Sequence, residues 1–285
     1  MMTSSPVLDS SRAIGVFDSG VGGLTVLRAL CAELPGEQFV YLGDTARLPY
    51  GTKSADTVAR YALQAADLLV GRGIKALIVA CNTASALALP SMRDRYRDLP
   101  LIGVVEPGAE AAVAATRNGC IAVIGTEATV RGGAYQRAIA RRRPDATVSA
   151  LACQLFVALA EEGWTGGAIA RATAQRYLAP LFGLELAAGS PVPDTLVLGC
   201  THFPALRPAI REVIGDQVAI VDSAATTARA AHLLLQQGGL LRARQAAHAP
   251  ALSFLATDSV ARFAAIGSRF LAHDIDAQQV ELVDL

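Results

Sequence analysis

The 285-residue sequence has no excess of charge of either sign, because 25 Lys and Arg residues balance 25 Asp and Glu residues. Nucleic acids and anionic membrane surfaces attract proteins with a basic excess or a dense basic stripe, so neither is an expected partner. No apolar run approaches the roughly 18–20 residues of a membrane span. The first residues, MMTSSPVLDSSR, lack the basic and apolar regions of a secretory signal. We therefore expect a cytoplasmic protein.

Metal-ligand spacings are also missing. The four histidines are scattered, and the five cysteines include no C-x-x-C pair, so the sequence predicts no zinc site. An odd number of widely spaced cysteines does not form a disulfide framework, and a chain of this size does not need one. The cysteines are Cys31, Cys81, Cys120, Cys153 and Cys200.

Lysine is scarce, with Lys53 and Lys75 as the only two. A pyridoxal-dependent enzyme needs a lysine for its Schiff base. Lys53 follows a turn, and Lys75 precedes a predicted strand at its amino end. Ligands of open α/β sheets bind beyond the carboxyl ends of the strands. A pyridoxal enzyme is therefore disfavoured, and no cofactor is expected.

Apolar residues make up 52% of the chain, enough for one large or two smaller cores. Short runs rich in Val, Ile and Leu alternate with longer stretches of helical spacing such as 24–34, 55–72 and 108–117. This alternation predicts an α/β fold with parallel sheets flanked by helices. The expected strands are 13–17, 39–42, 76–80, 101–105, 121–124, 195–198 and 218–221.

Three of these strands, with the loops that follow them, recur in the same order in the second half. The matched pairs are IGVFDSG with IAVIGTE, ALIVACNTA with TLVLGCTHF, and LIGVVEPGAEAA with VAIVDSAATTA. Three matches in one order predict two related α/β lobes. The expected first lobe is 1–105, completed by 222–285, and the second is 106–221. The lobes would meet near Glu106.

Cys81 and Cys200 follow equivalent strands of the two lobes. A lone cysteine at a strand end is usually an inert core residue, but two at matching points would flank one ligand from opposite sides. Each is expected at the start of a helix, whose dipole would lower the thiol pKa. One thiolate could remove a proton from one face of a carbon while the other thiol protonates the opposite face. Cys31, Cys120 and Cys153 are expected to be core residues.

Other loops that end the predicted strands carry polar groups suited to a small zwitterion, although each could also be a turn or cap. They are 43–45, 49–51, 126–129 and 222–223. The segment from Asp18 to Gly23 is a weak match to a phosphate loop, and Asp18 or Ser19 could instead cap the helix that follows. His202, two residues after Cys200, could help to orient or shuttle a proton.

Six motifs, in order from about residue 14 to 225, resemble the signature set of the glutamate racemase family. They are FDSGVGGL, GDTARLPYG, ACNTASA, VEPG, IGTEATV and GCTHFP. The resemblance implies two pseudo-symmetric α/β lobes with the active site in the cleft between them. It also implies cofactor-independent interconversion of L- and D-glutamate by Cys81 and Cys200, with D-glutamate feeding bacterial peptidoglycan synthesis. It also implies that Asp18 and His202 assist the thiols. The implied substrate contacts are Asp18, Ser19, Tyr50, Gly51, Asn82, Thr83, Thr126, Thr129, Thr201 and His202.

The resemblance leaves several points open. A glutamate supports the histidine in the family, and either Glu161 or Glu162 could correspond to it. Gln154 and Ala158 stand where the family usually has prolines, which puts local rigidity in doubt because proline fixes φ and removes a donor. A homodimer is expected by analogy only. The alternatives are a racemase for another acid such as aspartate, a two-lobed binding protein without catalysis, and a thiol–disulfide or peroxidatic protein.

Overall fold

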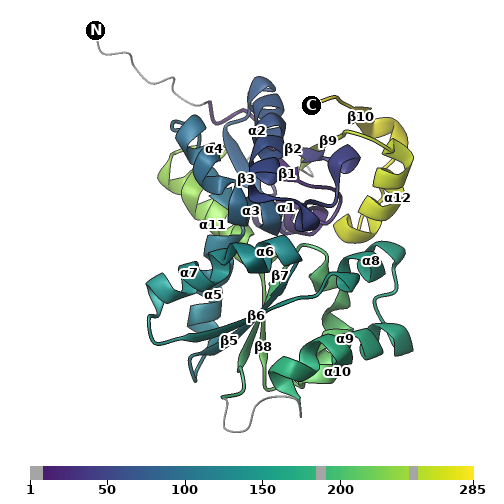
Figure 1. The fold of residues 1–285 in the computed structure, drawn as a ribbon. Coiled ribbons are helices and arrows are strands. Elements are labelled where there is room, and N and C mark those ends of the chain that lie inside the picture. The colour runs from purple at the N-terminus through teal and green to yellow at the C-terminus, as the bar shows by residue number, and fades with distance from the viewer. Residues whose placement is uncertain (1–8, 184–190, 244–249) are drawn as a thin grey trace.

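A computed structural model describes residues 9–183, 191–243 and 250–285 of the chain. The chain forms two separate sheets, and their strand pairs are parallel throughout. Six strands form the first sheet in the order β10-β9-β2-β1-β3-β4, and four form the second in the order β6-β5-β7-β8. Helices flank both sheets (Figure 1). The α/β class with two parallel sheets is therefore confirmed.

The two sheets repeat one topology. The order β2-β1-β3-β4 of the first sheet is the order β6-β5-β7-β8 of the second. The strands that occupy equivalent places are also those whose sequences match: β1 with β5, β3 with β7, and β4 with β8. The internal sequence echo thus corresponds to a structural one.

The first lobe begins with alternating strands and helices. Its strands β1 and β3 are buried at every position, as expected of central strands in a parallel sheet. Its elements are β1 (Ile14–Asp18), α1 (Leu24–Glu33), β2 (Gln38–Gly43), α2 (Ala55–Gly71), β3 (Ala76–Val79), α3 (Asn82–Leu87), α4 (Leu89–Arg95) and β4 (Leu101–Gly103), with short 3-10 turns at Thr45–Arg47 and Tyr50–Thr52.

The second lobe follows without interruption. Its elements are α5 (Val105–Ala115), β5 (Cys120–Gly125), α6 (Glu127–Gly132), α7 (Ala134–Arg142), β6 (Thr147–Ala152), α8 (Leu155–Glu162), α9 (Gly167–Phe182), β7 (Thr195–Gly199), a 3-10 turn at Phe203–Leu206, α10 (Arg207–Ile214) and β8 (Ala219–Asp222).

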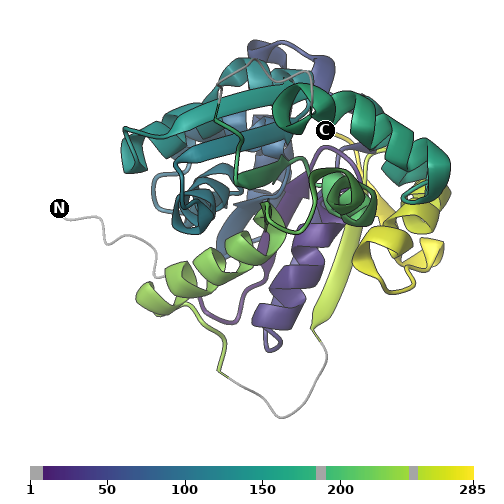
Figure 2. The same ribbon diagram turned by 90° about the horizontal axis from the view of Figure 1, so that it is seen from below.

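The C-terminal segment returns to the first lobe. It contains α11 (Ser223–Gln237), β9 (Ala251–Ala256), α12 (Val260–Leu271), a 3-10 turn at Ala277–Gln279 and β10 (Val280–Leu282). β9 pairs with β2, and β10 pairs with β9. α11 packs along α1 (Figure 2). β9 and β10 thus join the six-stranded sheet, while the lobe boundaries at 105/106 and 221/222 stay a prediction.

Two expectations about local structure were wrong. α5 begins at Val105 rather than at residue 108, because Pro107 lies in the first helical turn, where no backbone donor is needed. Glu106 is therefore not in a loop at the cleft; it forms ion pairs with Arg141 (2.5 Å) and Arg142 (2.6 Å) of α7. Three strands toward the sheet edges, β6, β9 and β10, were not predicted from the sequence, because each is only partly buried.

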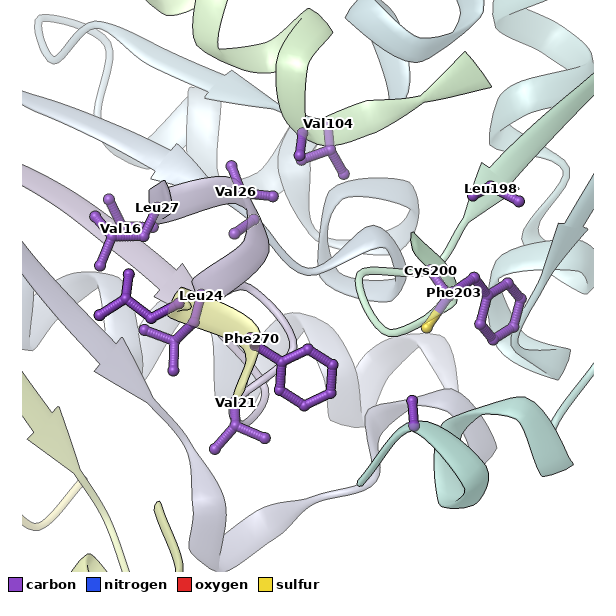
Figure 3. Packing of buried hydrophobic residues seen from close by; sticks show 14 of the residues in the cluster. Val16, Val21, Leu24, Val26, Leu27, Val104, Leu198, Cys200, Phe203 and Phe270 are labelled. Atoms are coloured by element: carbon purple, nitrogen blue, oxygen red, sulfur yellow. The ribbon is translucent and has the colours of Figure 1, made fainter. Parts of the chain in front are cut away.

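The lobes share a hydrophobic core at the end of β7. One cluster of buried residues includes Val16 and Leu24 of the first lobe, Leu198 and Phe203 of the second, and Phe270 of α12. Figure 3 shows Phe203 beside Cys200, just beyond Leu198. This packing fixes the loop that carries Cys200. Among the described residues, no helix has the length and apolar character to cross a membrane.

Candidate active site

A small cavity of about 50 Å³ lies between the carboxyl ends of the two sheets. Both Cys81 and Cys200 line it, as the two-lobe interpretation requires. Most of the residues singled out from the sequence lie in its wall, and Asp18 and Thr129 lie behind it. The wall consists of Ser19, Gly20, Leu48, Pro49, Tyr50, Gly51, Cys81, Asn82 and Thr83 of the first lobe and Thr126, Gln154, Val157, Glu161, Cys200, Thr201 and His202 of the second.

Cys81 caps the N-terminus of α3. Its Sγ accepts the Ala84 N–H at 3.4 Å, and its thiol donates to Ser19 Oγ at 3.4 Å. Burial, reinforced by the charge of Asp18, raises the pKa of Cys81 to about 12, although the contacts with Ser19 and Ala84 act to lower it. The expectation of a depressed thiol pKa is thus wrong for Cys81. Desolvation of the charged form outweighs the start of a helix only six residues long.

Asp18 ends β1 beneath the Cys81 side of the cavity and is 1% exposed. Its Oδ2 accepts the Gly20 N–H at 3.1 Å, and its Oδ1 has no partner among the described residues. Burial raises the pKa of Asp18, opposed by the nearby backbone N–H of Gly23 and by the charge of His202. A Cβ on Gly23 would lie 2.6 Å from Asp18 Cβ, so only glycine leaves room for this carboxylate.

The Cys200 side has a different support. Cys200 Sγ lies 3.8 Å from His202 Nδ1, and His202 Nε2 lies 3.2 Å from Glu161 Oε1. Burial acts to lower the pKa of His202, but hydrogen bonds with Cys200 and Glu161 prevail and raise it to about 10. Glu162 is exposed, so the geometry selects Glu161. The helix expected at Cys200 is absent: a turn follows, then a 3-10 segment, and α10 begins only at Arg207.

The C-terminal helix reaches across to this second group. Arg262 of α12 lies 3.4 Å from Glu161 Oε2, and Arg269 donates to the Glu161 carbonyl at 2.8 Å. The His202 ring packs edge-on against Phe270, with centroids 5.2 Å apart. α12 of the first lobe thus holds the acid of the second lobe. None of the six motifs indicated this contact, because they all lie before about residue 225.

Three threonine hydroxyls join the lobes at the cavity. Thr83 of α3 lies 2.9 Å from Thr126 and 3.1 Å from Thr129, and the two hydroxyls of the second lobe are 3.0 Å apart. Thr126 also caps α6. Thr83 and Thr126 face the cavity, and Thr129 completes the triangle from behind.

Tyr50 and Gly51 lie in the wall, but the Tyr50 hydroxyl is already engaged. It donates to Asp44 Oδ2 at 2.5 Å, and Asp44 also accepts from Arg47 Nε (2.7 Å) and from Thr257 Oγ1 (2.9 Å). Asp44 therefore anchors its loop and does not face the cavity. A Cβ on Gly51 would lie 2.7 Å from Thr126 Cβ, so this glycine allows the lobes to approach.

Three wall residues lie outside the site residues and loops predicted from the sequence: Leu48, Gln154 and Val157. In the sequence, Gln154 stands out only as a departure from the family. In the structure it precedes α8, and its Oε1 accepts the Glu127 N–H at 3.4 Å. The departure itself was the available signal, because it put a polar amide where the family usually has proline.

Two other residues considered in the sequence, Asp222 and Lys75, lie outside the cavity wall. Asp222 caps α11 by accepting the Ala224 N–H at 2.7 Å. Lys75 is fully buried before β3 and pairs with Glu37 at 2.5 Å, away from the cavity lining.

Fold and site together define a two-lobed α/β protein with a cavity at the carboxyl ends of its strands, the usual place for an active site in such sheets, and several polar side chains line it. The chain belongs to the Asp/Glu/hydantoin racemase family, whose model matches residues 14–231. It is an amino-acid racemase, and its resemblance to glutamate racemases is confirmed along nearly its whole length.

Three relatives illustrate this similarity. A glutamate racemase of Geobacter metallireducens is 50% identical over 274 residues, covering 95% of this chain and 97% of the relative. The crystal structure of a glutamate racemase isoform of Bacillus anthracis superposes with a TM-score of 0.88 at 36% identity, covering 97% of this chain and 98% of that one. A glutamate racemase of Francisella tularensis in complex with D-glutamate gives 0.87 at 33% identity, covering 96% and 98%.

Proposed function

We propose that this protein interconverts L- and D-glutamate without a cofactor, with Cys81 and Cys200 as the two acid–base groups. The observation that carries the proposal is the pair of buried thiols, one from each lobe, in the wall of a single cavity. The thiols are near enough that the charge of Cys200 raises the pKa of Cys81. Similarity to glutamate racemases, one of them bound to D-glutamate, supports the choice of substrate.

In each turnover one thiolate removes the Cα proton and becomes a thiol. The other thiol gives its proton to the opposite face of Cα and becomes a thiolate. The configuration inverts, and the two sulfur atoms exchange protonation states, ready for the reverse reaction. The α-ammonium group of a bound amino acid would favour a nearby thiolate electrostatically, which would offset the burial that raises the pKa of Cys81.

Polar groups in the wall are suited to the carboxylates of glutamate. Ser19, Asn82, Thr83, Thr126 and Thr201 carry donors in the cavity lining. Asp18 lies behind the wall, and Glu161 is engaged with His202, so they would act on the thiols rather than on the carboxylates. The D-glutamate formed would supply peptidoglycan synthesis.

The test is incubation of purified, cofactor-free protein with L-glutamate in deuterated water, following Cα–H exchange and optical rotation together. We expect exchange and loss of rotation to proceed together. Exchange with aspartate but not with glutamate would show that aspartate is the substrate. Absence of exchange with any acidic amino acid would contradict the proposal and favour a binding role.

Asp18→Asn keeps the side-chain shape but removes its charge. Because Asp18 lies behind the wall, we expect kcat to fall about 10-fold or more, within the range of acid–base effects, while KM changes little. Steady-state kinetics in both directions measure this. A rise in KM with kcat unchanged would instead make Asp18 a substrate-binding residue.

A further inference from the structure

Asn82 has a buried donor without a partner. The residue is 3% exposed, lies in the cavity wall directly after Cys81, and starts α3. Its Nδ2 is fully buried, and no acceptor for it exists in the described part of the chain. An unpaired buried amide donor is costly, on the order of 1–3 kcal/mol. A ligand carboxylate in the cavity would supply the missing acceptor.

The other end of the Asn82 amide is fixed by the second lobe. Tyr135 of α7 donates its hydroxyl to Asn82 Oδ1 at 2.7 Å. Tyr135 is 1% exposed, and burial raises its pKa, so the phenol keeps its proton.

The surroundings allow the Tyr135 ring little freedom. A Cβ on Gly108 of α5 would lie 3.1 Å from Tyr135 Cε1, and a Cβ on Gly199, directly before Cys200, would lie 3.2 Å from Cε2. Glycines on two elements of the second lobe thus leave room for the ring. The Tyr135 hydroxyl is held at one place against α3.

We propose that Tyr135 is a positioning residue for substrate recognition, which fixes the Asn82 amide so that its Nδ2 donor faces the cavity and binds a carboxylate of the substrate. An amide rotated by half a turn would present its oxygen to that carboxylate and repel it. Tyr135 prevents this rotation because Asn82 Oδ1 must accept the phenol proton. The inference rests on the proposed function, since glutamate supplies the carboxylate.

The test compares Tyr135→Phe, Asn82→Ala and the double variant, with Tyr96→Phe as the matched control. Tyr96 also donates its hydroxyl to a side chain, Asp67 at 2.5 Å, but on the outer surface of the first lobe. Loss of one buried hydrogen bond predicts that Tyr135→Phe raises KM for glutamate about 10-fold, with kcat changed by less than about 3-fold. Tyr96→Phe should leave both constants unchanged.

The double variant separates positioning from general damage. If Tyr135 acts through Asn82, the KM of the double variant equals that of Asn82→Ala. Without the Asn82 amide, the Tyr135 hydroxyl has no group to orient, so its removal adds no further loss. Two results would overturn the inference and leave the proposed racemisation intact. One is a KM increase in the double variant equal to the product of the increases in the two single variants, and the other is a KM for Tyr135→Phe within about 2-fold of wild type.

Urea unfolding gives a readout that does not depend on turnover. Tyr135→Phe leaves Asn82 Oδ1 buried without a donor, and Asn82→Ala removes that orphaned acceptor. The double variant should therefore be no less stable than Tyr135→Phe. If the wild type fails to racemise glutamate, the proposed function fails, and this cycle decides the Tyr135–Asn82 pairing by itself: additive destabilisation would overturn it.

Discussion

Cys81→Ala and Cys200→Ala are each expected to slow racemisation of glutamate by about 10³-fold or more, while both variants stay folded. Each thiol lies at one side of the same cavity, with its own support: Asp18 and Ser19 for Cys81, and His202 with Glu161 for Cys200. Inversion needs a base on one face of Cα and an acid on the other. Removal of either thiol therefore stops the reaction.

Deuterium incorporation should distinguish the two variants. The remaining thiol can still remove the Cα proton from the one enantiomer that presents it and return a deuteron to the same face. Cys81→Ala and Cys200→Ala should thus show slow exchange without inversion, each with a different enantiomer. Mass spectrometry of L- and D-glutamate recovered from deuterated water measures this. Exchange of both enantiomers by either variant would contradict the two-thiol scheme.

The chain offers matched controls for these substitutions. Cys120 is buried at the start of β5, and Cys31 is half-buried on α1. Neither lies in the cavity wall. Cys31→Ala and Cys120→Ala should racemise glutamate at the wild-type rate. A loss of activity in these controls as large as in the other variants would show that the effect comes from the fold rather than from the site.

Glu161→Gln is expected to lower kcat/KM by about 10²-fold and to change its dependence on pH. The substitution removes the carboxylate that accepts from His202 Nε2. Burial opposes protonation of His202, but hydrogen bonds with Cys200 and Glu161, together with the charges of Cys200 and Asp18, raise its pKa from 6.5 to about 10. Without the carboxylate the pKa falls, and the high-pH limb of kcat/KM should move to lower pH.

The same pKa shift predicts how stability depends on pH. His202 binds its proton more tightly in the folded state, so its contribution is fully present below pH 6.5 and is lost as pH rises through about 10. Glu161→Gln should reduce this contribution at neutral pH and make the loss between neutral and alkaline pH smaller. Urea unfolding of both proteins at several pH values measures the difference.

Glu162→Gln is the control, because it makes the same chemical change one residue along the chain. Glu162 is exposed, whereas Glu161 is part of the cavity wall. Glu162→Gln should leave both the pH profile and the stability as in the wild type. Equal shifts in the two variants would mean that net charge, and not the contact with His202, sets the pKa.

Local patterns in the sequence predicted much of the architecture. Strands such as β1, β3 and β7 are buried along their whole length, so they are recognisable in the sequence as short apolar runs. The loops after them carried Asp18, Cys81 and Cys200, and a parallel sheet brings such loops to one edge. The partly exposed edge strands β6 and β10 lack that signal, which is why they were missed.

Details of the site depended on contacts between distant segments. Glu161 and Glu162 are neighbours with the same side chain, yet only Glu161 reaches His202, 41 residues away. Tyr135 reaches Asn82 across 53 residues and from the other lobe. No local spacing indicates which member of such a pair turns inward, because the choice follows from how the helices pack.

The sequence by itself thus determined a two-lobed parallel α/β protein with a cysteine at equivalent strand ends, since both properties follow from local apolar patterns and their repetition. Only the tertiary structure decided the electrostatics of the site. The sequence suggested a lowered thiol pKa for Cys81 from its place before a helix, whereas burial raises that pKa to about 12. Desolvation depends on everything that surrounds a group, and most of those atoms come from residues far away in the chain.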